Sequence, residues 1–153
     1  MMDDLESGAM LLEQIETGIE ALQLVAHRAS KNRGWWRDPV SGENLLPLGL
    51  GAEGPTSEKL AAWFPYVVAA KIALIHSEVS EMLEAYRKDA QDDKLPEFSG
   101  VTVEMADVLI RVADLAGALN LPVALALREK LIYNAIRADH NPEARAAPGG
   151  KKF

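Results

Sequence analysis

The stretch VTVEMADVLIRVADLAGALN, from Val101 to Asn120, decides the fold. Its only charged residues are Glu104, Asp107, Arg111 and Asp114. Their spacing of 3, 4 and 3 residues places all four on one narrow stripe of a helix. A helix that is apolar on its other faces is predicted to be buried. Because carboxylates inside a buried surface are costly without a cation beside them, we expect a cationic group against this stripe.

A second amphipathic helix is predicted between Pro65 and Asp89. Its apolar sector consists of Val68, Ile72, Ile75, Val79, Met82, Leu83 and Tyr86. Glu78 and Glu81 fall at the edge of this sector and face partly inward. The solvated side carries Glu84, Arg87, Lys88 and Asp89. The short connection to the next helix favours antiparallel packing, which brings the inward acidic pair opposite Glu104 and Asp107.

Four carboxylates in one small site predict a bound cation. Two like charges about 4 Å apart repel by roughly 1 to 4 kcal/mol at effective dielectrics between those of water and a protein surface. All-oxygen ligation suits hard divalent ions such as Mg²⁺ or Mn²⁺, and the chain has no cysteine for a softer metal. The alternative is that the acids form buried ion pairs with Arg111, Lys71 or Arg137.

Composition limits the class of protein. The chain of 153 residues is long enough for one domain with a core. Its net charge of −7 argues against nucleic acid or an anionic membrane as the main partner. No apolar run approaches the length of a membrane span, and no basic segment precedes a hydrophobic one near Met1. We therefore expect a cytoplasmic protein.

The chain is predicted to be an all-α, four-helix bundle. Helical spacing predicts helices at 7–31, from Thr56 or Ser57 to 89, at 102–119 and at 123–138, with Pro65 at a kink or restart. Glycine and proline mark residues 32–55 as a long loop. We expect one domain over residues 1–140 and a flexible tail at 141–153. Wide apolar helix surfaces predict self-association.

The last helix carries three candidate phosphate ligands. Lys130, Asn134 and Arg137 are spaced by 4 and 3 residues, so an ammonium, an amide and a guanidinium share one helix face. Such a trio suits phosphate oxygens, and the alternative is a solvated face with surface ion pairs. Lys71, two turns before Glu78, is a further candidate, or else a lysine at the boundary of the core.

These motifs together resemble the MazG-like all-α nucleoside triphosphate pyrophosphohydrolases, a superfamily that includes dimeric dUTPases and phosphoribosyl-ATP pyrophosphohydrolases. The resemblance covers about Trp63 to Arg137. It rests on Glu78-x-x-Glu81, a gap of 22 residues, Glu104-x-x-Asp107 within EMADVLIR, and Lys130-x-x-x-Asn134-x-x-Arg137.

The resemblance implies a metal-dependent hydrolase. The four acids would bind Mg²⁺ or Mn²⁺, two or more ions per site, and Lys130, Asn134 and Arg137 would hold the triphosphate. A nucleoside triphosphate would be cleaved between its α and β phosphates, giving a monophosphate and pyrophosphate. The family also implies a homodimer or homotetramer.

One position departs from the family pattern. Many relatives carry a further glutamate directly before the first acid of the motif, where this chain has Ser77. The catalytic candidates are therefore Glu78 and Glu81, either of which would orient the attacking water. The inward angle of Glu78 favours it as the general base.

The loop after the first helix is the candidate site for the nucleobase. Asn32, Trp35 and Trp36 combine two aromatic rings with a polar donor, which can stack on a base and bond to its edge. The stacking area suggests a purine deoxynucleotide such as dGTP. The alternative is that the two tryptophans anchor the loop on the core or at an oligomer interface. Trp63 is predicted to be a core residue and His27 a structural one.

Other functions compete with this interpretation. The chain can instead be a non-enzymatic helical interaction module whose acidic stripe pairs with basic residues of a partner. A ferritin-like dimetal oxidase normally needs Glu-x-x-His pairs, and no histidine follows an acid at that spacing here. Within the hydrolases, a specialist for dUTP or phosphoribosyl-ATP is a further possibility.

Overall fold

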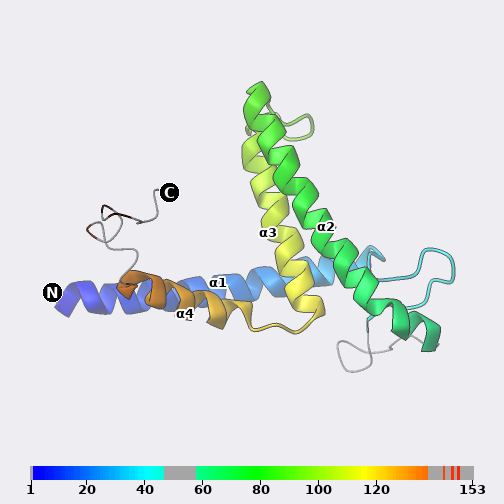
Figure 1. Ribbon diagram of the computed structural model, residues 1–153, viewed down its shortest axis with the longest axis horizontal. Coiled ribbons are helices and arrows are strands. Elements are labelled where there is room, and N and C mark those ends of the chain that lie inside the picture. Colours follow the sequence, from blue (N-terminus) through cyan, green and yellow to red (C-terminus); the bar gives the residue numbers. More distant parts are fainter. Residues whose placement is uncertain (1, 47–57, 138–142, 144–145, 147, 149–153) are drawn as a thin grey trace. The chain divides into compact units, whose positions relative to one another are not determined.

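The computed structural model describes residues 2–46, 58–137, 143, 146 and 148 (Figure 1). These residues form four helices, α1 (Met2–Asn32), α2 (Glu58–Lys88), α3 (Gly100–Ala118) and α4 (Val123–Ile136). The described part of the chain has no strand, so the predicted all-α class is confirmed. Residues 47–55 of the predicted loop and most of the predicted tail at 141–153 lie outside the described residues.

The chain divides into two units. The first, which we call the hairpin unit, spans Ala21–Leu121 and contains the end of α1 with α2 and α3. There α2 and α3 lie side by side as an antiparallel pair (Figure 1). The second, the terminal unit, combines Met1–Glu20 with Pro122–Phe153. In it Arg128 of α4 forms an ion pair with Glu16 of α1 at 3.6 Å.

Helix α1 ends in a turn that reverses the chain. Gly34 has a φ of +80°, a conformation that costs little only for glycine. The amide of Gly34 donates to the carbonyl of Lys31 at 3.0 Å, and the amide of Trp35 donates to that of Ser30 at 3.2 Å. This pair of bonds is a Schellman motif, which satisfies carbonyls that the helix end leaves open. The turn sends the following residue, Trp36, back toward the helices.

The hairpin of α2 and α3 is closed by similar caps. Asp89, at the end of α2, and Asn120, at the end of α3, both have positive φ angles and lie in the same type of turn. At the start of α3 the hydroxyl of Ser99 accepts a bond from the amide of Thr102 at 3.3 Å. These caps fix where each helix ends and so fix which residues face each other.

The buried core of the hairpin unit is small. Trp36, Leu46 and Ala118 are almost fully buried, and Phe64 and Leu115 are among the side chains that pack on them. The buried residues of α3 are mostly small, namely Gly100, Ala113, Ala116 and Ala118, together with Asp114. At Gly117 the backbone of α3 comes close to His27 and Gln23 of α1.

Several large apolar residues are exposed. On α2, Tyr86 is 75% and Leu83 58% exposed, although both belong to the apolar sector predicted to be buried. On α3, Leu109 and Met105 are exposed as well. The prediction that Trp63 is a core residue is wrong, because its side chain is 57% exposed and lies beside Tyr66. A single chain therefore leaves the apolar faces of α2 and α3 uncovered.

Among the described residues, no single helix is both long and apolar enough to cross a bilayer. Only α3 and α4 taken together, with the break between them, reach the required length and composition.

Gly117 provides a test of the close approach between α1 and α3. A Cβ added there would lie 2.6 Å from the Cβ of His27 and 3.2 Å from the carbonyl oxygen of Gln23. We expect Gly117→Ala to lower the free energy of unfolding by about 1 to 3 kcal/mol, as overpacking does. Urea unfolding followed by circular dichroism measures this change.

The matched control is Gly18→Ala in α1, where a Cβ would meet no atom within 4 Å. Alanine is a better helix former than glycine, so this variant should be neutral or more stable by roughly 0.5 to 1 kcal/mol. Equal stability changes in the two variants would contradict the close packing at Gly117.

Candidate metal centre

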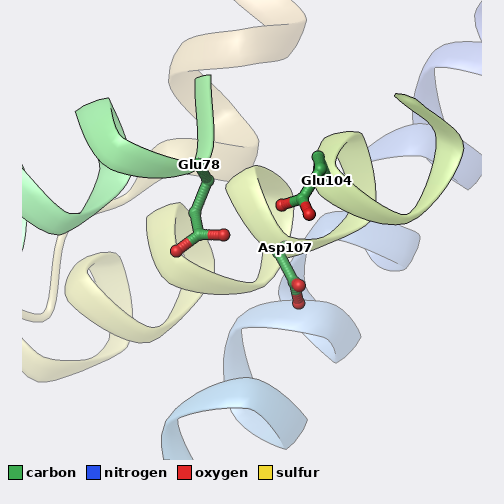
Figure 2. Close-up of side chains that lie close together, drawn as sticks. All are labelled: Glu78, Glu104 and Asp107. Carbon is green, nitrogen blue, oxygen red and sulfur yellow. The ribbon is translucent and has the colours of Figure 1, made fainter. Parts of the chain in front are cut away.

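Three of the four predicted metal ligands converge in the hairpin unit. Glu78 projects from α2, and Glu104 and Asp107 project from α3 (Figure 2). One carboxylate oxygen from each lies within 4.8 Å of the other two. Because Glu104 and Asp107 are three residues apart, they lie one turn apart on the same side of α3. We call these three residues the acidic triad.

Glu81 lies outside the triad. Its side chain is exposed, one turn further along α2. Its charge nevertheless reaches the site, because it is one of the charges that raise the pKa of Glu104. The structure therefore brings Glu78, Glu104 and Asp107 together and leaves Glu81 at their margin.

The electrostatics of the triad favour a bound cation. The pKa of Glu104 is raised to about 6, most of all by burial, and also by a hydrogen bond with Glu78 and by the charges of Glu81, Glu78 and Asp107. The Oε2 atom of Glu104 is buried and has no hydrogen-bond partner. A buried acceptor without a donor is costly, and a cation in place of the proton would satisfy it.

The donor set fits a hard divalent ion. Mg²⁺ binds oxygen at about 2.1 Å in octahedral geometry, so two ligands of one ion lie roughly 3 Å apart when adjacent and about 4.2 Å apart when opposite. The triad oxygens lie within 4.8 Å of one another, so the side chains would draw together around an ion. Mg²⁺ or Mn²⁺ would thus be held by three carboxylates from two neighbouring helices.

The predicted alternative, an ion pair, is also present at one of the acids. Nη2 of Arg111 lies 2.5 Å from Oε1 of Glu78, whose side chain is only 7% exposed. Among the described residues, no cation forms an ion pair with Glu104 or Asp107. The guanidinium therefore neutralises one acid of the triad and leaves the other two without a counter-ion.

A cavity adjoins the triad inside the hairpin unit. It has a volume of about 390 Å³ and is lined by α1, α2, α3 and the turn after α1. Its polar and aromatic lining consists of Ser30, Arg33, Trp35, Lys71, Asp107, Arg111 and Asp114. Because Asp107 also belongs to the triad, a ligand in this cavity would lie next to a metal held by the three acids. The cationic lining residues Arg33 and Arg111 were not among the residues predicted to bind substrate.

Lys71 is held in a fixed position on the cavity wall. Its Nζ donates to the carbonyl of Trp35 at 3.0 Å and lies 4.4 Å from the ring centroid of Trp36. Burial lowers the pKa of Lys71, the nearby charge of Asp114 opposes this shift, and the charge of Arg111 adds to it. The predicted substrate lysine and Arg111 thus line the same cavity.

Asp114 organises the loop that forms one side of the cavity. Its carboxylate accepts hydrogen bonds from Nδ1 of His27 at 3.0 Å, the hydroxyl of Ser30 at 2.7 Å and Nε1 of Trp36 at 2.8 Å. The sequence predicted a cationic group against the stripe that includes this acid, and the charge of Lys71 interacts with Asp114 in addition to these three donors. The spacing along α3 indicated the buried acid, and only the fold could reveal its partners in α1 and the loop.

The two tryptophans have different positions. Trp36 is 1% exposed, and its indole is held by Asp114. This position matches the alternative interpretation, in which the ring anchors the loop on the core. Trp35 is 66% exposed and lines the cavity, so one face of its ring is accessible to a ligand. Asn32, the last residue of α1, is exposed.

The three candidate phosphate ligands lie in the terminal unit, Lys130 and Asn134 on α4 and Arg137 directly after it. Nζ of Lys130 and the guanidinium of Arg137 lie 5.0 and 5.5 Å from the ring centroid of Tyr133, which the sequence analysis did not single out. The Oδ1 atom of Asn134 is buried without a hydrogen-bond partner. Their binding of a triphosphate stays a prediction.

Comparisons with known proteins do not identify the chain. No family model matches it, and searches of curated proteins and of solved structures find no match either. The resemblance to MazG-like hydrolases therefore stays a prediction.

The raised pKa of Glu104 predicts how metal-free stability depends on pH. With a pKa of about 6 in the folded chain against the usual 4.5, the folded state holds this proton more tightly. This contribution to stability is therefore complete below pH 4.5 and is lost as the pH rises through about 6. We expect the melting temperature without divalent ions to fall between pH 5 and about pH 7.5.

Glu104→Gln removes the titrating group and should flatten this fall, whereas Glu97→Gln, at an exposed loop position, should keep it. Saturating Mg²⁺ should flatten it in the unmodified chain, because the ion takes the place of the proton. A fall of the same size in the Glu104→Gln variant would contradict the assignment.

Proposed function

We propose that the chain is a metal-dependent nucleoside triphosphate pyrophosphohydrolase of the MazG-like superfamily. It would cleave a deoxynucleoside triphosphate between the α and β phosphates, releasing a monophosphate and pyrophosphate. The observation that carries the proposal is the convergence of Glu78, Glu104 and Asp107 beside a cavity lined by cations. Acids that bind divalent ions and cations that bind phosphate are what this reaction needs.

Each part of the site has a defined task in this proposal. The triad would hold Mg²⁺ or Mn²⁺, which when bound neutralises phosphate charge and lowers the pKa of a water molecule. Glu78 would orient that water and take its proton, with exposed Glu81 as the other candidate. The water oxygen forms a new bond to the α phosphorus, and the bond from this phosphorus to the bridging oxygen breaks. Pyrophosphate leaves with the bridging oxygen and its electron pair.

The cavity supports binding of the nucleotide next to the triad. Lys71 presents a positive charge from a fixed position, and Trp35 offers an exposed aromatic face. Stacking on that face favours a large base, so a purine such as guanine in dGTP is the proposed substrate. Lys130, Asn134 and Arg137 of the terminal unit stay candidates for binding phosphate.

Self-association is part of the proposal. The apolar faces of α2 and α3 carry exposed Leu83, Tyr86, Met105 and Leu109, which a single chain leaves in water. A homodimer or homotetramer that packs these faces together would bury them.

Activity measurements with matched variants test the function. The chain should release pyrophosphate from at least one nucleoside triphosphate in Mg²⁺ or Mn²⁺. A panel of all the nucleoside triphosphates, with dUTP and phosphoribosyl-ATP, identifies the substrate. Glu78→Gln should lower kcat by about 100-fold or more, as loss of a metal ligand and base does.

The control is Glu84→Gln on the solvated side of the same helix, where the acid forms exposed ion pairs with Arg87 and Lys88. This variant should keep the kcat of the unmodified chain. Full turnover by Glu78→Gln with metal still bound would refute the role of Glu78. Release of phosphate and a nucleoside diphosphate would refute cleavage between the α and β phosphates.

The tryptophans allow a test of base recognition. Trp35→Ala should raise KM by about tenfold with little change in melting temperature, because stacking is worth roughly 1 to 3 kcal/mol per base. Trp36→Ala should instead lower the free energy of unfolding by about 3 to 5 kcal/mol, since it empties a core position. Steady-state kinetics and thermal unfolding of both variants check this contrast, and an unchanged KM in Trp35→Ala would exclude stacking on this ring.

A second candidate is a non-enzymatic helical interaction module. The ion pair between Arg111 and Glu78 supports it, because this pair neutralises one acid without any metal. The exposed apolar faces of α2 and α3 also suit a protein partner. Such a module should gain no stability from Mg²⁺ or Mn²⁺, whereas a metal site should raise the melting temperature further as the ion concentration rises above its dissociation constant.

A further inference from the structure

Arg111 connects the acidic triad with the cavity. Its Nη2 lies 2.5 Å from Oε1 of Glu78, and the same residue lines the cavity that Asp107 borders. The two partners differ in exposure, since the side chain of Arg111 is 41% exposed and that of Glu78 only 7%. The carboxylate is thus fixed inside the protein, whereas the guanidinium is at the end of a long side chain beside open space.

The guanidinium and a divalent ion would compete for the same carboxylate. An ion held by the triad needs an oxygen of Glu78, and Arg111 now binds one of the two oxygens of this group. Glu104 favours the divalent ion in this competition. Its buried Oε2 has no hydrogen-bond partner, and the guanidinium does not supply one. A divalent ion near the three carboxylates attracts all of them with its two charges, whereas the guanidinium of Arg111 contacts only that of Glu78.

The cavity lining is rich in cations, so the displaced guanidinium would bind an anion there. Lys71 already lies there at a fixed point, and the proximity of Arg111 contributes to lowering its pKa. The carboxylate of Asp114 already accepts from three donors, which leaves about one acceptor site for Arg111. With Asp107 engaged by a metal, the cations of the cavity would outnumber its available carboxylates, and a phosphate would balance them.

We propose that Arg111 is an exchangeable counter-ion, displaced from Glu78 when a divalent ion binds the triad and then free to bind a phosphate group in the cavity. The inference rests on the proposed function, because it takes the metal and the phosphate substrate from it. Metal binding thereby prepares the anion site, so the phosphate chain binds well only after the ion has bound. In the metal-free chain the same residue keeps the buried Glu78 neutralised.

Opposite effects of one substitution test this role. Arg111→Met keeps the apolar stem and removes the charge. The variant should bind Mn²⁺ about tenfold more tightly than the unmodified chain in the absence of nucleotide, because no guanidinium competes for Glu78. The Mn²⁺-loaded variant should bind inorganic triphosphate about tenfold more weakly. Calorimetric titration measures both constants, and neither depends on activity or on the identity of the base.

Two further variants complete the experiment. Arg87→Met removes an arginine that pairs with Glu84 on the solvated side of α2, and it should change neither constant. Arg111→Lys keeps the charge but loses the planar fork, so it should shift both constants in the same directions by smaller factors. If Arg111→Met does not fold, as circular dichroism would show, Arg111→Lys carries the test.

The outcomes are distinguishable. An equal or weaker affinity of the Arg111 variants for Mn²⁺, or an unchanged affinity for triphosphate, overturns the exchange while leaving the proposed function in place. An unmodified chain that binds no Mn²⁺ at millimolar concentration overturns the proposed function and the inference together.

Discussion

Repulsion among the carboxylates of Glu78, Glu104 and Asp107 is the constraint on which the site depends. Helices α2 and α3 pack as an antiparallel pair with capped ends, so the three groups are held within 4.8 Å of one another. The chain relieves part of this repulsion by two means that the structure shows, a raised pKa of Glu104 and the ion pair of Glu78 with Arg111. Neither supplies a partner for the buried oxygen of Glu104. A divalent ion would relieve all of it, because it replaces the proton and meets the three oxygens at once.

The rest of the hairpin unit positions the cavity next to these acids. Gly34 reverses the chain after α1, Trp36 enters the core, and Asp114 holds its indole from α3. The same turn places the carbonyl of Trp35 where it fixes Lys71. One buried acid and one reversed turn therefore set the position of a lysine that faces the proposed phosphate site. Several large apolar residues of α2 and α3, such as Leu83, Tyr86, Met105 and Leu109, are exposed in the single chain.

The sequence predicted the helices and three acids of the site well, because these depend on local spacing. Helical periodicity located all four helices, and the spacing of Glu104 and Asp107 placed them on one face of α3 opposite Glu78. The sequence predicted less well which surfaces are buried, as the exposed Trp63 shows, because burial depends on how the helices are packed in space. The partners of Asp114 were not predictable for the same reason, since they lie more than 70 residues away in the chain. The ion pair of Arg111 with Glu78 was foreseen only as an alternative, and both it and the acidic triad occur together.

Anomalous diffraction from crystals of the protein grown with MnCl₂ would show whether the acidic triad binds a divalent ion. Data collected on either side of the manganese absorption edge locate the ion without reference to any activity. We expect an anomalous peak about 2.2 Å from oxygens of Glu78, Glu104 and Asp107, with the Arg111 guanidinium moved away from Glu78. Crystals that show no peak at these acids while Arg111 remains bound to Glu78 would contradict this expectation.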